Sequence, residues 1–85
     1  LITFYTGNEK ECNAWTIVSG GNIVEGAGVI HTDLAKSFIT ADVVNVEKML
    51  DVGGWQDAKE SGLVRNHGKE HIIQDGDYIV VYASR

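Results

Sequence analysis

Alternation of apolar and polar residues predicts two strands at the start of the chain. Leu1 to Thr6 is rich in aromatic and β-branched residues, and Cys12 to Val18 alternates in the same way. The polar residues from Gly7 to Lys10 between them are typical of a turn. We therefore expect an N-terminal β-hairpin.

The next patterns predict a short helix and then a third strand. Asn22 and Glu25 have the spacing of a capping box, which marks the first turn of a helix. The apolar residues that this helix would turn inward are Val24, Ala27 and Ile30. The segment from 39 to 43 has the clearest alternation in the chain, so we expect a half-buried strand whose apolar face is formed by Ile39, Ala41 and Val43.

Helical spacing returns in the second half of the chain. One short helix is predicted by the apolar residues Val46, Met49 and Leu50. Trp55 with Ala58 predicts another short helical turn, which Gly62 can end.

Two further strands are predicted near the C-terminal end, at His71 to Gln74 and at Tyr78 to Tyr82, joined by the tight-turn sequence Asp75-Gly76. About five short strands with one or two short helices indicate a small α+β roll, and residues 1–85 form a single domain in this interpretation. The expected core consists of Phe4, Ile17, Ile39, Val43, Ile72, Ile79 and Val81, with Trp15 or Trp55 closing one end.

Composition narrows the functions that this domain can have. Twelve acidic residues against seven basic ones give a formal net charge of −5, and the basic residues are dispersed along the chain. Non-specific DNA binding is driven by cations that release counterions from phosphates, so we expect no DNA partner. No apolar run approaches the roughly 18–20 residues that span a bilayer, so we expect no membrane partner either.

Cys12 is the single cysteine, which excludes an internal disulfide or a thiolate zinc cluster. In an alternating strand we expect a buried and inert thiol, and this cysteine usage fits a reducing, cytoplasmic compartment. The chain starts directly in a predicted strand at Leu1, which suggests a fragment of a longer protein.

His31 and Asp33 are the first candidate site, two residues apart after the first predicted helix. Such a pair could serve acid–base chemistry or form one edge of a metal site, but no nucleophile and no further ligands lie nearby in sequence. The structural alternative is that His31 bonds a carbonyl group while Thr32 or Asp33 caps the next turn.

Other candidate sites lack a necessary residue. His67 and His71 would share one face of a helix, but the sequence between and after them indicates a loop leading into a strand. The run from Asp75 to Asp77 lacks the spaced acidic ligands of a calcium loop. No glycine-rich stretch is followed by the Lys-Ser/Thr pair of a phosphate-binding loop. The two tryptophans could stack on single-stranded RNA, although core positions are the simpler interpretation.

Four stretches occur together and in order: LITFYT at residues 1–6, AWTI at 14–17, AGVIHTD at 27–33 and QDGD at 74–77. In this combination they closely resemble the C-terminal TGS domain of the YchF/Obg-like ATPase family, over essentially the whole chain. The resemblance implies a ubiquitin-like β-grasp fold, appended to a P-loop nucleotidase that carries a coiled-coil insertion.

The same resemblance implies a regulatory or interaction domain without catalysis of its own. ATP or GTP with Mg²⁺ would bind the parent's G domain, outside this chain, so no catalytic, cofactor-binding or metal-binding residue is expected here. Family members associate with ribosomes and translation, and the implied partners are the parent G domain and the ribosome or its RNA.

Departures from the family pattern bear on the alternatives. Asn13 and Thr40 stand where arginine is common, which weakens an RNA-facing role because each phosphate contact needs its own charge. One alternative is a stand-alone RNA-binding module. A weaker one is a β-grasp carrier protein, which would need a free C-terminal Gly-Gly where this chain ends Ala83-Ser84-Arg85.

The segment from Ala27 to Asp33 is the most family-specific stretch, and it is denser in polar groups than a connection between elements requires. We expect this segment and the loop before it to contact a partner, through the side chains of His31, Thr32, Asp33 and Lys36. His31 and Asp33 would offer a donor and an acceptor, with Lys36 as the nearest cation.

Overall fold

The computed structural model describes residues 1–7 and 12–84, so most of the predicted turn from Gly7 to Lys10 lies outside the described residues. The strands are β1 (Ile2–Gly7), β2 (Cys12–Ile17), β3 (Phe38–Asn45), β4 (Arg65–His67) and β5 (Asp77–Ala83). The helices are α1 (Ile23–Ile30), α2 (Thr32–Lys36), α3 (Val46–Asp51) and α4 (Trp55–Glu60). The described residues thus contain four short helices, where the sequence pattern predicts one or two.

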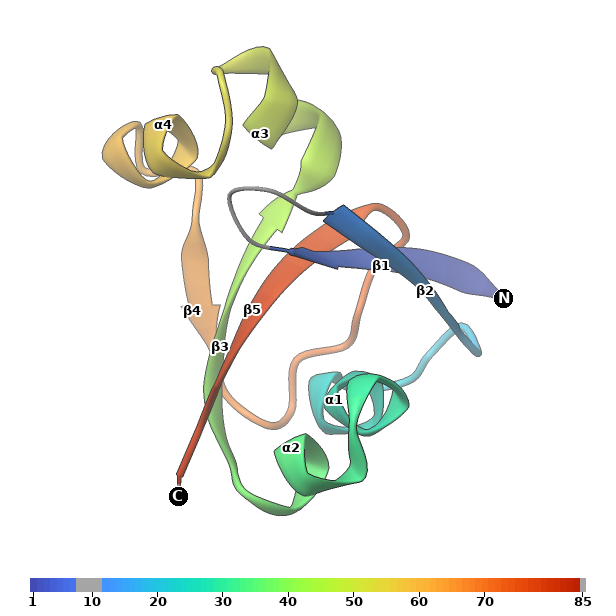
Figure 1. Cartoon of the computed structure of the whole chain (residues 1–85). Helices are drawn as coiled ribbons and strands as arrows, with labels where there is room; N and C mark the ends of the chain where they lie inside the picture. Colours follow the sequence, from blue (N-terminus) through green and yellow to red (C-terminus); the bar gives the residue numbers. More distant parts are fainter. Residues whose placement is uncertain (8–11, 85) are drawn as a thin grey trace.

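The strands form one mixed sheet in the order β2-β1-β5-β3-β4 (Figure 1). β1 and β2 make the predicted antiparallel hairpin, with Phe4 opposite Trp15. β1 pairs in parallel with β5, whereas β3 is antiparallel to both β5 and β4. This five-stranded sheet with a few short helices confirms the α+β, β-grasp architecture expected from the sequence.

Helix α1 packs against one face of the sheet and begins at the predicted capping box. The Asn22 side chain accepts a hydrogen bond from the Glu25 N–H at 2.9 Å, and the Glu25 side chain accepts one from the Asn22 N–H at 3.2 Å. A Cβ at Gly26 would overlap the Ile73 side chain, so glycine permits a close approach here. The resulting core cluster consists of Phe4, Ile17, Ile23, Ala27, Phe38, Ala41, Val43, Ile73 and Ile79.

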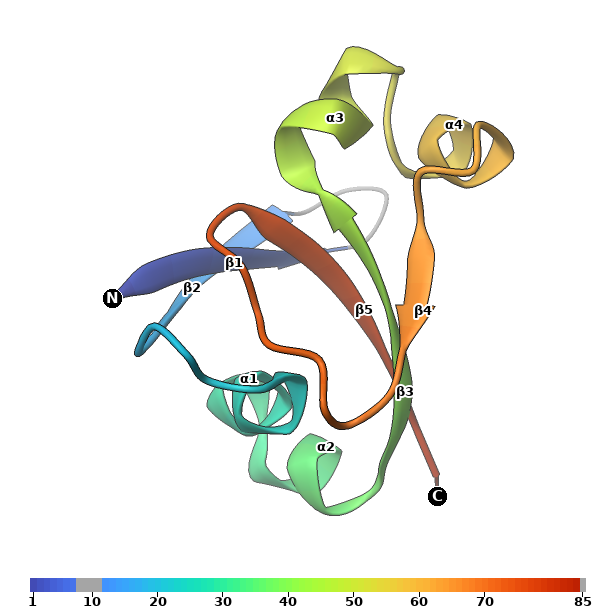
Figure 2. The same cartoon turned by 180° about the vertical axis from the view of Figure 1, so that it is seen from behind.

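A second, smaller core cluster lies under α3 and α4, at the opposite end of the sheet from α1 and α2 (Figures 1 and 2). Its buried members are Val44, Met49, Ala58 and Tyr78. Trp55 packs against this cluster with its ring 5.6 Å from that of Tyr78, and Trp15 packs against the first cluster. Each tryptophan thus closes the margin of one core cluster.

Two of the predicted core residues are wrong. The pairing of β3 with β5 is irregular between Phe38 and Thr40, and this irregularity places Phe38 in the core while leaving Ile39 53% exposed. Ile72 is 43% exposed because residues 71–74 form an isolated bridge at Ile72 and no strand. Ile73, which is 1% exposed, occupies the core in its place.

Two further expectations fail for local reasons. A loop was predicted at His67, but this residue lies in β4, which pairs with β3. The strand was not predicted because it forms through backbone hydrogen bonds to β3 and has no alternation of apolar residues. Cys12 is exposed, since it lies on the edge strand β2 opposite Gly7, which has no side chain to cover it. Within the described ranges, no helix has the length and apolar character needed to cross a bilayer.

Candidate functional site

The four predicted contact residues come together at the junction of α1 and α2. His31 has an extended backbone, with φ −164° and ψ 135°, and this single residue separates the two helices. Its N–H donates to the Ala27 carbonyl at 2.9 Å and so ends α1. Its imidazole Nδ1 accepts a hydrogen bond from the Asp33 N–H at 3.1 Å and so caps α2.

This geometry corrects the structural interpretation of the pair. His31 itself is the N-cap of α2, in place of Thr32 or Asp33, and its ring accepts from a backbone N–H instead of bonding a carbonyl. Neutral imidazole carries one proton, so acceptance at Nδ1 puts that proton on Nε2. The cap therefore orients a hydrogen-bond donor at the far side of the ring.

The polar groups of this junction are open to solvent. The side chains of His31 and Asp33 are 63% and 79% exposed, and Thr32 and Lys36 are exposed as well. A carboxylate oxygen of Asp33 lies 3.7 Å from the His31 Nδ1. One short helix thus presents an imidazole, a hydroxyl, a carboxylate and an ammonium group, and we call His31, Thr32, Asp33 and Lys36 the α2 surface.

The apolar side of the same helices fixes the α2 surface in place. Val24, Ile30 and Leu34 are partly buried and pack against the first core cluster. The Ser37 N–H and hydroxyl both donate to the Asp33 carbonyl, at 3.1 and 2.7 Å, and close α2. Because α2 is capped at both ends and packed along its inner side, its backbone is fixed. Its exposed side chains therefore start from fixed positions.

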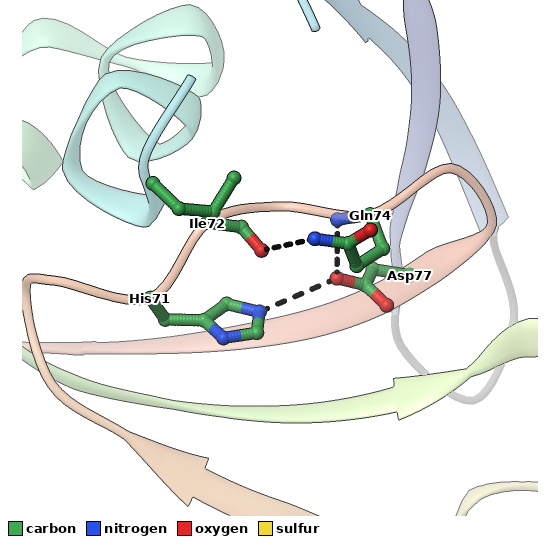
Figure 3. A network of polar contacts seen from close by, with 4 residues as sticks. All are labelled: His71, Ile72, Gln74 and Asp77. Carbon is green, nitrogen blue, oxygen red and sulfur yellow. Dashed lines mark hydrogen bonds and ion pairs between the residues drawn. The ribbon is translucent and has the colours of Figure 1, made fainter. Parts of the chain in front are cut away.

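A second polar cluster, which the sequence interpretation did not assemble, joins β4 to the start of β5. Asp77 is 7% exposed, and its carboxylate accepts the Gln74 N–H at 2.8 Å and lies 3.4 Å from the His71 Nε2 (Figure 3). The His71 ring stacks on that of His67 with 4.1 Å between centroids. Asp77, from a predicted turn, thus contacts His71, which in turn stacks on His67.

Burial, together with neighbouring charge, disfavours a protonated His67 in this second cluster. Burial lowers the pKa of the His67 imidazole, and the neighbouring His71 and Arg65 lower it further, while Asp77 opposes them. No group of three or more histidine, cysteine or acidic side chains is placed to hold a metal ion in residues 1–7 and 12–84. The histidine spacing noted in the sequence thus marks a stacked pair.

Comparison with known protein families identifies the relatives of this chain. Residues 1–83 match the family model YchF-GTPase_C, described as a protein of unknown function (DUF933). The "Ribosome-binding ATPase YchF" of Bacillus subtilis (strain 168) is 47% identical over 79 residues, which are 93% of this chain and 22% of that protein. The protein of the same name from Escherichia coli O157:H7 is 44% identical over 77 residues, which are 91% of this chain and 21% of that protein.

A solved structure agrees with the sequence comparison. The Schizosaccharomyces pombe YchF GTPase superposes with a TM-score of 0.87 at 30% identity, over 95% of this chain and 21% of that one. The chain therefore spans about a fifth of the length of the relatives that it matches.

Proposed function

Because the chain belongs to the YchF-GTPase_C family, we propose that it is the regulatory and interaction domain of a ribosome-associated ATPase and acts by contact. The observation that carries the proposal is the match of residues 1–83 to this family, together with the similarity over 79 and 77 residues to relatives named ribosome-binding ATPases. That segment has the TGS-like fold described above. The parent protein would work with ribosomes in the cytoplasm.

Hydrolysis of ATP or GTP with Mg²⁺ would belong to the G domain of the parent. The sequence of this chain contains no glycine-rich loop followed by Lys-Ser/Thr, the element that cradles phosphates in such enzymes. The G domain is accordingly the intramolecular partner in this proposal, and contact with it is the route to regulation.

We assign contact with the ribosome to the α2 surface. Three features support this assignment: the exposure of its side chains, the fixed backbone of α2, and the cap that orients the imidazole of His31. Exposed donors, acceptors and a cation on a rigid element suit recognition of RNA phosphates or of polar protein groups. Lys36 is the one α2 residue able to contribute a permanent positive charge to such a contact.

Ribosome co-sedimentation of the full-length parent tests this assignment. His31→Ala and Lys36→Gln should each reduce the ribosome-bound fraction severalfold, because a charge-assisted hydrogen bond is worth about 1.5–3 kcal/mol. Lys59→Gln on α4 makes the same charge change as Lys36→Gln at the other end of the sheet, and it should leave binding unchanged.

A cap-preserving variant separates contact from stability. His31→Ala removes the α2 cap and should cost about 1 kcal/mol, whereas asparagine at position 31 supplies another capping oxygen. We expect His31→Asn to keep the melting temperature and still to bind ribosomes weakly. Full binding by His31→Asn, or equal losses in the Lys36 and Lys59 variants, would remove the α2 surface from the interaction.

The ATPase rate of the same variants, measured without ribosomes, tests the intramolecular role. A changed basal rate in the Lys36→Gln parent would point to the G domain as the partner of this surface. An unchanged rate with reduced co-sedimentation would point to the ribosome.

A further inference from the structure

A pocket of about 320 Å³ lies at the β4 side of the sheet, away from the α2 surface. Antiparallel partners share a face, and Arg65 and His67 pair with Val43 and Ala41, which are core residues beneath α1. Arg65 and His67 therefore face the side of the sheet on which α1 lies. The chain from 68 to 76 crosses that side and brings His71 and Asp77 to the same pocket (Figures 2 and 3).

Basic side chains are concentrated in this pocket although the chain has a formal net charge of −5. Of the eight lysine, arginine and histidine side chains among the described residues, four line it: Lys48, Arg65, His67 and His71. Neither Lys48 nor Arg65 has a carboxylate oxygen within 4.0 Å in the part of the chain that the structure describes. Both cations also keep exposed side chains at the rim.

Among the described residues, Asp77 is the one carboxylate that lines the pocket, and one of its two oxygens is engaged. Asp77 accepts the Gln74 N–H at 2.8 Å, and its carboxylate faces the His71 Nε2 at 3.4 Å. Both contacts fall on the same oxygen, Oδ2 of Asp77. The basic groups that the pocket leaves free for a ligand are hydrogen-bond donors. They are the Arg65 guanidinium, the Lys48 ammonium and the imidazole of His67.

We propose that this pocket binds a phosphate group, presented by a nucleotide that is either free or part of an RNA chain. A guanidinium fork, an ammonium and an imidazole offer donors in different directions, which suits the tetrahedral array of phosphate oxygens better than a planar carboxylate. The volume is at the lower end of the range for small-ligand sites, which is sufficient for a phosphate group. The inference does not depend on the α2 surface.

Binding should be visible at the histidines. A phosphate in the pocket would offset the repulsion that His71 and Arg65 from β4 exert on a protonated His67, and would add to the attraction of Asp77 from β5. Lys48 from α3 lines the same pocket. The pKa of His67 should therefore rise when the pocket is filled. For the phosphodiester groups of an oligonucleotide, whose charge is constant in this range, affinity should increase as the pH falls through the titration of His67.

NMR titration of the 85-residue chain at fixed ionic strength tests the proposal. The probes are inorganic phosphate, AMP, and a short oligoribonucleotide with and without a 5′-phosphate, and chloride is the reference anion. We expect saturable shifts of the His67 and His71 ring signals. AMP binding without oligonucleotide binding would identify a free nucleotide, and tighter oligonucleotide binding would identify RNA.

Charge-removing variants supply the control. Arg65→Gln and Lys48→Gln should each weaken phosphate binding about tenfold, whereas Lys59→Gln on α4, outside the pocket, should leave it unchanged. Both pocket cations are exposed, so these variants are expected to fold. Shifts no larger than those caused by chloride, or equal weakening in all three variants, would overturn the proposal.

Discussion

Phe38 and Ile39 offer a direct test of how β3 faces the core. Phe38 is 5% exposed in the first core cluster, whereas its neighbour Ile39 is 53% exposed. Truncating a buried phenylalanine to alanine costs about 3–5 kcal/mol, since it removes apolar contacts and leaves a cavity. Ile39 keeps half of its surface in water and would leave no enclosed cavity, so Ile39→Ala should cost about 1 kcal/mol or less.

This difference is large for a domain whose total stability is on the order of 5–10 kcal/mol. Urea unfolding of the 85-residue chain, followed by tryptophan fluorescence, should show a much lower midpoint for Phe38→Ala and a nearly unchanged one for Ile39→Ala. At about 4–8 °C per kcal/mol, the melting temperatures should also separate clearly. Phe38→Leu is a milder variant that keeps the comparison measurable if Phe38→Ala does not fold.

The two variants distinguish the observed irregularity from simple alternation. Strict alternation through β3 would put Ile39 on the same buried face as Ala41 and Val43. A loss at Ile39→Ala as large as that at Phe38→Ala would therefore refute the irregular pairing between Phe38 and Thr40. The m-value must stay constant for this comparison, because a change would show that the unfolding reaction itself differs.

Two further predictions concern a titration and a cap. The His67 imidazole should titrate below 6.5 in NMR, because burial, His71 and Arg65 lower its pKa, and His71→Gln should raise it; an unaltered midpoint in that variant would contradict the stacked arrangement. The pKa of His67 is lower in the folded than in the unfolded chain, so neutral His67 contributes to the free energy of unfolding. This contribution is full above pH 6.5 and is lost as the pH falls through the pKa of folded His67. Asn22→Ala should lower the free energy of unfolding by about 1 kcal/mol in thermal denaturation, whereas Asn22→Asp should retain the cap; equal losses would argue against the capping box.

The elements that could be predicted from the sequence are those in which the local pattern of apolar and polar residues indicates which side is buried. In β1 and α1 the apolar residues recur at the period of the element, and α1 also carries its cap in the sequence. β5 is instead a continuous apolar run, and in β2 only Trp15 and Ile17 turn toward the core. β4 consists of three polar residues, of which only His67 is half-buried, and it forms by pairing with β3. The local sequence gives no indication of this pairing. The irregularity at Phe38 is likewise a property of the strand pair.

The two polar sites differ in the same way: the α2 surface is local in the sequence, whereas the cluster of His67, His71 and Asp77 depends on pairing between distant segments. The α2 surface lies within six consecutive residues, so its grouping follows from chain position alone. The cap formed by His31 was missed because the common N-cap residues are serine, threonine, aspartate and asparagine. His67, His71 and Asp77 meet only because β4 pairs with β3 and the following chain returns to β5, and their sequence signal was a spacing that suggests a helix.

Gln74 to Asp77, one of the motifs that carry the family resemblance, is accounted for by the fold. The Thr3 N–H donates to the Asp75 carboxylate at 2.9 Å, and the Gly76 N–H donates to the Thr3 carbonyl at 2.8 Å. The Val46 N–H donates to the Gly76 carbonyl, also at 2.8 Å, while Gly76 adopts a φ of +87° that favours glycine. This turn thereby joins β1, the start of α3 and β5.

The α2 surface differs in where its hydrogen bonds go. The His31 side chain caps only the helix that follows it, and the structure records no ion pair for Lys36 among the described residues. Polar side chains that close the fold, as in the 74–77 turn, need no partner to explain them. The polar side chains of the α2 surface stabilise little beyond their own helical turn. Stability therefore does not account for their presence, and binding to a partner would. For this reason a loss of ribosome binding on changing Lys36, at unchanged stability, would be evidence for contact, whereas the same loss on changing Asp75 would reflect unfolding.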